Sequence, residues 1–360
     1  MAITFKTLPK GSTIGSGSYI FRHYGNEVIP DYLCFTAEKA RSTVAMAVYG
    51  TPTKGQAFEY STNGRNWSVF TPGTTTITLA KVGDKVYFRG DNTTVSESDS
   101  IYYKFAMGGK IAASGNIMSL LDKTCQSTTI SNKYCYCSMF RGCTSLTTAP
   151  VLPATTLAFN CYYGMFNDCR SLTTAPSLPA TTLVNNCYNG MFSGCISLTT
   201  APSLPATTLT DYCYGNMFKG CTRLTTAPSL PATTLANNCY GYMFKGCTSL
   251  TTAPSLPATV MADYCYDSMF QNCTSLTTAP ALPATTLANN CYNSMFYNCA
   301  NLQVYSSSGT GHTKAWRIPT SGIASSYTSQ PKMFYKCPGS YKSTSRVLLN
   351  TTFYTQNTPV

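Results

Sequence analysis

Between residues 135 and 302 the apolar residues of this chain recur with a fixed period of 26 residues. The repeated unit reads C-Y-x-x-M-F-x-x-C-x-x-L-T-T-A-P-x-L-P-A-T-T-L-x-x-x, and seven copies follow one another in register. The first cysteine of the unit stands at Cys135, Cys161, Cys187, Cys213, Cys239, Cys265 and Cys291. One such unit is too short to bury its own apolar face, so we predict that the copies stack on one another as successive coils.

Each coil is expected to contain one short strand and one helical segment. Leu172–Ala175 is β-forming, and Pro176 should end the strand because proline cannot donate a hydrogen bond to a neighbouring strand. The apolar residues of 187–195 have the i, i+4, i+5, i+8 spacing typical of a helix or a 3₁₀ segment. Fixed leucines at a period of this length are typical of leucine-rich repeats. The predicted fold class is therefore an α+β solenoid of seven 26-residue leucine-rich repeats.

The cysteines are predicted to be free thiols in the core. Fourteen of the 18 occupy two positions of the repeat that are separated by seven residues. Equivalent side chains of stacked coils point the same way, which is poor geometry for a disulfide, and a free cysteine packs as a small apolar group. The spacing, with no accompanying histidine, also differs from the paired cysteines of a zinc site.

The flanking segments lack this period. Residues 31–115 should form a small all-β, sandwich-like domain, because strand-like alternation is interrupted by turn signals such as Asn63-Gly64. Residues 116–134 should cap the N-terminal end of the solenoid, and residues 1–30 should form an anchoring arm. Residues 303–360 are assigned to a C-terminal cap and basic tail, in which Met333-Phe334 and Cys337 repeat part of the motif. The strand-like stretches are 43–49, 57–60, 67–70, 76–79 and 85–88.

The composition excludes several classes of protein. With 43% hydrophobic and 11% charged residues, the chain is neither disordered nor a coiled coil. No apolar run approaches the length of a membrane span, so no membrane insertion is expected. The two histidines lie in separate flanks, and no phosphate-binding or metalloprotease motif is present. We therefore expect no enzyme, no catalytic residue, no metal and no cofactor.

The formal net charge of +12 is concentrated at the two ends of the chain. Residues 1–134 carry a net +5, residues 135–302 a net +1, and residues 303–360 a net +6. The basic residues are scattered rather than clustered, which favours a solvated surface and argues against a nucleic-acid partner.

The copies differ mainly at the three residues before the first cysteine and at the two residues after the following tyrosine. These positions are rich in Asn, Tyr, Gly and Ser, which suit adaptable contacts. The uniform threonine stripe offers a second surface, suited to a periodic ligand such as a polysaccharide. Drift on a tolerant solvent face is the competing explanation of the variation. We place ligand recognition on the predicted helical side, at Tyr163, Asn189, Tyr212, Asn216, Tyr242, Asp267 and Asn293.

The stretch from Met139 to Leu157 resembles the BspA-like leucine-rich repeats of gut Bacteroides and of the phages that infect them, the crAss-like phages among them. The fifth copy departs from the pattern at Val260-Met261. The segments 60–67, 85–90 and 115–121 resemble the small β domain that often precedes such repeats. The resemblance implies a BspA-type leucine-rich repeat array with a role in adhesion, since family members are known or suspected adhesins.

Three functions stay open within this resemblance. The first residues do not have the pattern of a secretory signal, which favours a phage virion protein made in the host cytoplasm. Such a protein would be a fibre or a capsid decoration protein that binds the host-cell surface or a glycan. The alternatives are a bacterial cell-surface adhesin and a purely structural virion protein.

The expected partners follow from these functions. The N-terminal region should bind phage capsid or tail proteins, and the repeats should bind bacterial surface polysaccharide or protein. Fibres are commonly trimers, so further copies of the chain are expected in a homo-oligomer.

Overall fold

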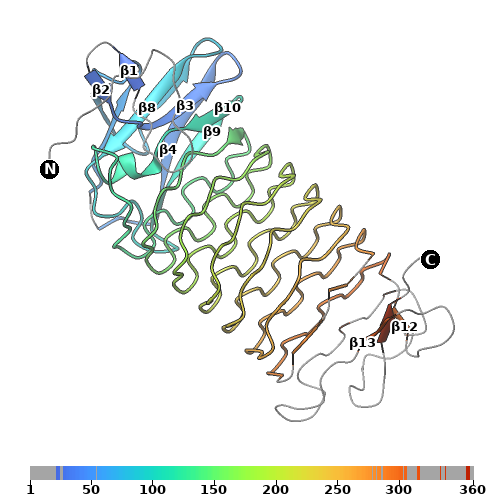
Figure 1. The fold of residues 1–360 in the computed structure, drawn as a ribbon. Helices are drawn as coiled ribbons and strands as arrows, with labels where there is room; N and C mark the ends of the chain where they lie inside the picture. The colour runs from blue at the N-terminus through green and yellow to red at the C-terminus, as the bar shows by residue number, and fades with distance from the viewer. Residues whose placement is uncertain are drawn as a thin grey trace.

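A computed structural model describes residues 22–24, 27–53, 55–277, 279–280, 282–284, 287–302, 304–305, 314–316, 333, 337 and 354–356. Strands gather at the N-terminal end, and a row of stacked coils extends from them (Figure 1). The arm predicted at residues 1–30 and the tail predicted at 303–360 lie mostly outside the described residues. The strands outside the main sheets are β1 (Arg22–Tyr24), β2 (Glu27–Ile29), β12 (Val304–Tyr305), β13 (Lys314–Trp316) and β14 (Tyr354–Gln356).

Two sheets face each other across an aromatic core in the N-terminal region, and all their strand pairs are antiparallel except the parallel pair of β10 with β11, which comes from the first repeat. One sheet has the strand order β11-β10-β3-β8-β5-β6 and the other the order β7-β4-β9. Phe105 of the second sheet contacts Phe35 and Phe88 of the first, with ring centroids 4.8 and 5.3 Å apart. The strands are β3 (Leu33–Ala37), β4 (Ser42–Tyr49), β5 (Phe58–Ser61), β6 (Ser68–Phe70), β7 (Thr76–Leu79), β8 (Lys85–Gly90), β9 (Tyr102–Gly108), β10 (Ile111–Ser114) and β11 (Leu146–Thr148).

The five strand-like stretches of the sequence coincide with β4 to β8, and β7 has the predicted bounds. Buried and partly exposed residues alternate along β8, as expected for a strand with one face on a core. Strands β3, β9 and β10 were not predicted. In β3 four of five residues are buried, so the alternation that would reveal a strand is missing there.

The first five repeats each contribute one rung to a parallel ladder at the Leu-Thr-Thr segment. Thr148 pairs with Thr174, Thr174 with Thr200, and the series continues to Thr252. Among the described copies of this segment, only the first is long enough to count as a strand, β11, which also pairs with β10 of the N-terminal region. The prolines that follow each segment explain this brevity, because they cannot extend the ladder.

The helical half of the prediction, and with it the α+β class, is wrong. Among the described residues the only helix is the 3₁₀ segment η1 (Ile117–Leu120), which precedes the repeats. The predicted helical side is instead a series of turns, in which successive N–H groups donate alternately to the same coil and to the next coil. Tyr163 and Met165 donate to carbonyls three residues back in their own coil, at 3.2 Å each. Tyr162 and Gly164 donate to the next coil, at 3.1 and 2.9 Å.

Left-handed residues explain why no helix forms. Each of the seven copies has three residues with positive φ, four residues apart, such as Asn186 (58°), Gly190 (62°) and Gly194 (76°). A left-handed residue ends a right-handed turn, so every turn stops after four residues and the next one begins. The i, i+4, i+8 apolar spacing therefore comes from a four-residue turn and not from the 3.6-residue helix.

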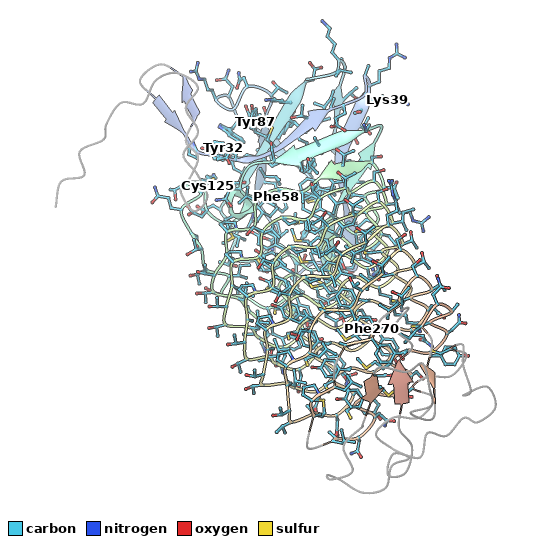
Figure 2. The ribbon with its side chains drawn as sticks, turned by 45° about the vertical axis from the view of Figure 1, so that its right-hand side comes forward. Tyr32, Lys39, Phe58, Tyr87, Cys125 and Phe270 are labelled. Atoms are coloured by element: carbon cyan, nitrogen blue, oxygen red, sulfur yellow. The ribbon has the colours of Figure 1, made fainter. Side chains whose placement is uncertain are left out.

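The N-terminal region ends the stack by supplying an additional rung. Phe105 on β9 donates its N–H to Met139 at 2.8 Å, as Phe140 does to Met165 at 2.9 Å. The rings of Phe105 and Phe140 are stacked at 5.3 Å, which extends the phenylalanine column of the array by one member. Buried residues of the two regions consequently form one continuous core, and Figure 2 shows the side chains, Phe270 among them, filling the inside of the stack.

The motif echo near the C-terminus is a partial eighth rung. Phe296 donates its N–H to the carbonyl of Met333 at 2.9 Å, which repeats the bond between Phe270 and Met295. The thiol of Cys337 donates to the carbonyl of Phe296 at 3.0 Å. Met333 and Cys337 are both buried, so they continue the columns of the repeats after a long insertion.

Candidate functional site

The stack presents two regular surfaces to solvent. The first, which we call the threonine face, carries exposed threonines of the central coils in four parallel columns. The second, which we call the turn face, consists of the four-residue turns around each first cysteine. Exposed threonines of the central coils are Thr173, Thr174, Thr181, Thr182, Thr199, Thr200, Thr207, Thr208, Thr225, Thr226, Thr233, Thr234, Thr251 and Thr252.

The seven predicted site residues lie on the turn face at different depths. Tyr212 is the most exposed of them, with 42% of its surface accessible. Asn189 and Asp267 are buried, at 8% and 3%, so their side chains are not presented to solvent. The half-buried residues are Tyr163, Asn216, Tyr242 and Asn293.

A polar network connects three of these residues across neighbouring coils. Asn293 donates from Nδ2 to Asp267 at 2.9 Å, and the Ser268 hydroxyl donates to the same Asp267 oxygen at 2.9 Å. Burial raises the pKa of Asp267, and hydrogen bonds from Tyr242, Ser268 and Asn293 oppose that rise. Burial and the neighbouring Asp267 together raise the pKa of Tyr242 to about 12. The polar groups of this network are hydrogen-bonded to one another, so we assign them a structural role in the turn.

Backbone conformation explains most of the Asn, Gly and Ser at the variable positions. The residue before the first cysteine and the residue three places after it both have positive φ in every copy. Glycine and asparagine tolerate this conformation best, which is a structural reason for their frequency there. The composition of these positions therefore follows from the turn and is not by itself a sign of ligand contact.

Tyrosine at the same positions has no such explanation. Tyr212 and Tyr264 have φ of 57° each and are 42% and 39% exposed. Tyr264 was missed by the sequence reasoning, although Asp263-Tyr264 repeats Asp211-Tyr212 two copies later. That repetition was the signal that could have found it.

The cysteine columns belong to the core. The thiol of Cys221 donates to the carbonyl of Phe192 at 3.1 Å, and the equivalent bond recurs from Cys143 to Cys299. Burial raises the pKa of the Cys221 thiol to about 12, so it stays protonated at neutral pH and is a poor nucleophile or metal ligand. Among the described residues, no group of three or more His, Cys, Asp and Glu side chains is arranged to hold a metal ion.

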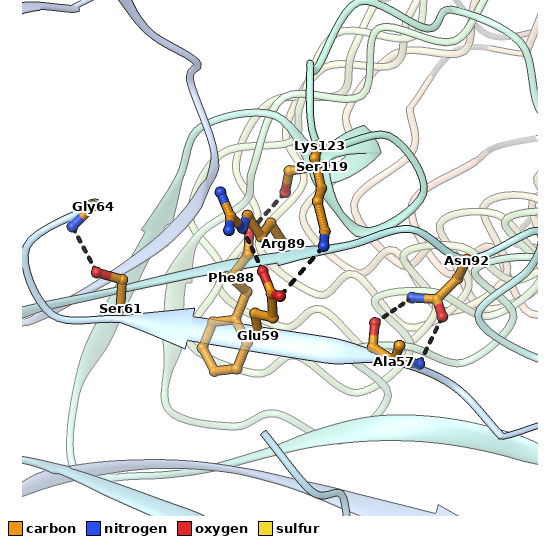
Figure 3. A network of polar contacts seen from close by, with 9 residues as sticks. All are labelled: Ala57, Glu59, Ser61, Gly64, Phe88, Arg89, Asn92, Ser119 and Lys123. Atoms are coloured by element: carbon orange, nitrogen blue, oxygen red, sulfur yellow. Dashed lines mark hydrogen bonds and ion pairs between the residues drawn. The ribbon is translucent and has the colours of Figure 1, made fainter. Parts of the chain in front are cut away.

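A charged cluster ties the β sheet to the segment before the repeats (Figure 3). Arg89 donates to Glu59 at 2.6 Å, and Lys123 lies 3.3 Å from the other oxygen of the same carboxylate. The Arg89 guanidinium also covers the ring of Trp67, 4.0 Å from its centroid. Burial alone would raise the pKa of Glu59, but the two hydrogen bonds and positive charges hold it below its usual range. All groups are paired, so the cluster is a structural clasp.

No helix in the described ranges combines the length and the hydropathy that crossing a membrane requires.

Comparison with known proteins identifies the repeats. The model of the BspA type leucine rich repeat region matches in six copies, over residues 122–240 and 214–310. No curated protein and no solved structure matches the chain. The matched segments cover more than half of the 360 residues, in the part where coils stack through thiol, phenylalanine and threonine columns. The chain therefore belongs to the family of BspA-type leucine-rich repeat proteins.

Proposed function

We propose that this protein is a non-enzymatic recognition protein, whose solenoid of repeats displays the turn face to the surface of a bacterial cell. The observation that carries the proposal is the pair of exposed tyrosines, Tyr212 and Tyr264, in a backbone conformation that tyrosine disfavours. A BspA-type repeat region also suits surface or protein interaction, because stacked repeats offer extended faces.

We place the protein on a phage virion, as a fibre or capsid decoration protein made in the host cytoplasm. All 18 cysteines are free and buried, so the chain needs no oxidising compartment to fold. In this assignment the N-terminal region binds capsid or tail proteins and forms the homo-oligomer. The repeats then extend outward, and their lateral faces contact host polysaccharide or protein.

Two alternatives share the same array. In the first the protein is an adhesin on a bacterial surface, and in the second it is a structural virion protein without a receptor. The chemistry of the array fits all three functions equally, because each of them requires only a stable stack of repeats that is exposed to solvent.

One experiment with two readouts tests the proposal. The fluorescently marked full chain is incubated with a panel of gut bacteria, and antibodies against it are applied to phage particles and bacterial cells under the electron microscope. Cell binding together with labelled particles is the expected result. Binding with label on bacterial cells alone favours the adhesin, and labelled particles without cell binding favour the structural protein. Absence of both signals refutes all three.

A further inference from the structure

One column of the turn face has twice the period of the rest of the array. The two residues before the first cysteine alternate between Asn-Asn and Asp-Tyr in five successive coils, and we call them the alternating column. They are Asn185-Asn186, Asp211-Tyr212, Asn237-Asn238, Asp263-Tyr264 and Asn289-Asn290.

In three of the five pairs the side chain of the first residue accepts a hydrogen bond from the next coil. Asp211 Oδ1 accepts the N–H of Asn237 at 2.9 Å, Asn237 Oδ1 accepts that of Asp263 at 3.2 Å, and Asp263 Oδ1 accepts that of Asn289 at 2.9 Å. Asparagine and aspartate perform this role equally well. This backbone contact therefore does not by itself require the alternation.

The second residue of each pair is left-handed, with φ between 52° and 58° across the column. Asparagine accepts that conformation readily, whereas a residue such as tyrosine loses about 1–2 kcal/mol. Tyr212 and Tyr264 are 42% and 39% exposed, so neither ring recovers the loss by full burial in the core. Exposed tyrosine rings in a backbone conformation that costs free energy indicate contact with a ligand outside the chain.

The spacing of the coils indicates the class of ligand. The buried tyrosines of successive coils, such as Tyr240 and Tyr266, lie 5.9 Å apart between ring centroids, which is comparable with the length of one pyranose. Tyr212 and Tyr264 hold the same repeat position two coils apart, so a sugar chain that follows the stack would meet one of them at about every second sugar. In a β-1,4-linked glycan successive sugars are turned over, so every second sugar presents the same C–H face.

We propose that the alternating column binds a neutral, unbranched β-1,4-linked polysaccharide that lies along the stack. Tyr212 and Tyr264 stack on alternate sugars, and the amide of Asn238 between them hydrogen-bonds hydroxyls of the intervening sugar. The carboxylates of Asp211 and Asp263 stand beside the tyrosines in the chain, which disfavours an anionic glycan. This inference rests on the proposed recognition function and names its ligand.

The array supplies variants that separate binding from folding. The double variant Tyr212→Asn/Tyr264→Asn gives coils four and six the Asn at this position that coils three, five and seven already have. Its stability should equal or exceed that of the wild type. Tyr134→Asn is the matched control, because Tyr134 holds the same left-handed repeat position in the first coil, before the five coils of the alternating column, and packs against Phe159, 5.6 Å away.

The test is isothermal titration of the full chain with β-1,4-linked xylo-, manno- and chito-oligosaccharides, from disaccharide to octasaccharide. We expect one series to bind, with affinity rising as the chain becomes long enough to reach both rings. The double variant should lose about tenfold or more in affinity, and Tyr134→Asn should bind as the wild type does. Equal binding by the double variant, or no binding of any series, overturns the inference.

Cell binding separates this inference from the proposed function. If the double variant still binds the cells that the wild type binds, the ligand site proposed here is wrong while the recognition function stands. Cell binding that is abolished by protease treatment of the cells, and unaffected by glycan oxidation, identifies a protein partner and likewise overturns the inference. If the wild type binds neither cells nor glycans, both proposals fail.

Discussion

The β domain (residues 31–115) and the repeat array (residues 135–302) bury aromatic rings in different ways. In the β domain Phe88 meets Phe35 and Phe70 edge to face, at interplanar angles of 70° and 76°. In the array Phe166, Phe192 and their equivalents lie parallel, with angles of 1° to 9° between neighbours. Equivalent residues in stacked coils are related by translation, so their rings must be parallel, whereas unrelated residues are free to choose the edge-to-face contact.

Phe105 belongs to both arrangements. It meets Phe35 and Phe88 at 67° and 79°, and it stacks on Phe140 at 11°. Phe105, a residue of strand β9, thus stands before Phe140 as the first ring of the phenylalanine column. A different fold can therefore cap an array if it presents a ring and several backbone N–H groups in the register of the repeat, as Phe105, Ser96 and Ile111 do here.

The largest effect should come from alkaline pH, which separates the two regions by their thiols. Burial raises the pKa of Cys135 and Cys213 to about 12, against an ordinary value of 9.0. Because the folded pKa is the higher one, these thiols contribute fully below pH 9 and lose their contribution as pH rises towards 12. Each buried thiol then loses about 1.4 kcal/mol per pH unit, and the array has many. We expect the array to unfold between about pH 9 and about pH 11.

Circular dichroism across this range would follow the unfolding of the whole chain, and hydrogen exchange would resolve the two regions. The β domain has a single cysteine, Cys34, and should keep its exchange protection to higher pH than the array does. An array that stays folded at about pH 11 would contradict the assignment of the thiols to a sealed core.

The second largest effect should come from Phe105→Ala, which removes the residue that both regions share. Loss of a buried phenylalanine costs about 3–5 kcal/mol, and here it also breaks the contact that couples the two cores. At neutral pH, where the thiols are protonated and do not yet destabilise the array, we expect calorimetry to show one unfolding transition for the wild type and two for Phe105→Ala. Phe70→Ala is the control, since Phe70 is equally buried but contacts only the β domain among the aromatic pairs. Two transitions in the control, or one in Phe105→Ala, would remove Phe105 from this coupling role.

The smallest effect should come from Glu59→Gln, which loosens the clasp between the β domain and the segment before the repeats. The carboxylate is 29% exposed, so the loss should be about 0.5–1 kcal/mol and should shrink in high salt. The folded pKa of Glu59 lies below its ordinary value, so its contribution is present above about pH 4.5 and is lost as pH falls further. Thermal unfolding at neutral and acidic pH should show a difference between wild type and variant that disappears in acid. Glu38→Gln, at the more exposed pair with Lys110, should change less.

The candidate surface was only partly predictable from the sequence. Comparing the copies found Tyr212, because exposed variable residues differ where the core residues do not. The same comparison could not distinguish Tyr212 from Asn189 or Asp267, since the turn sends neighbouring residues alternately outward and inward. Left-handed backbone at the variable positions could also not be recognised, because asparagine and glycine suit both a strained turn and a ligand contact.

The sequence by itself determined the number of coils, the columns of cysteine, phenylalanine and threonine, and the reduced state of the thiols. A strict 26-residue period places identical residues above one another, so these features follow whatever the exact path of each coil. The tertiary structure decided the rest. In the turns, every second N–H donates to a carbonyl of the next coil, and only a stacked neighbour can supply that carbonyl. These bonds between coils are why turns form in place of the expected helix. The place of Phe105 in the array was decided in the same way, because no local pattern on β9 reveals the acceptor at Met139.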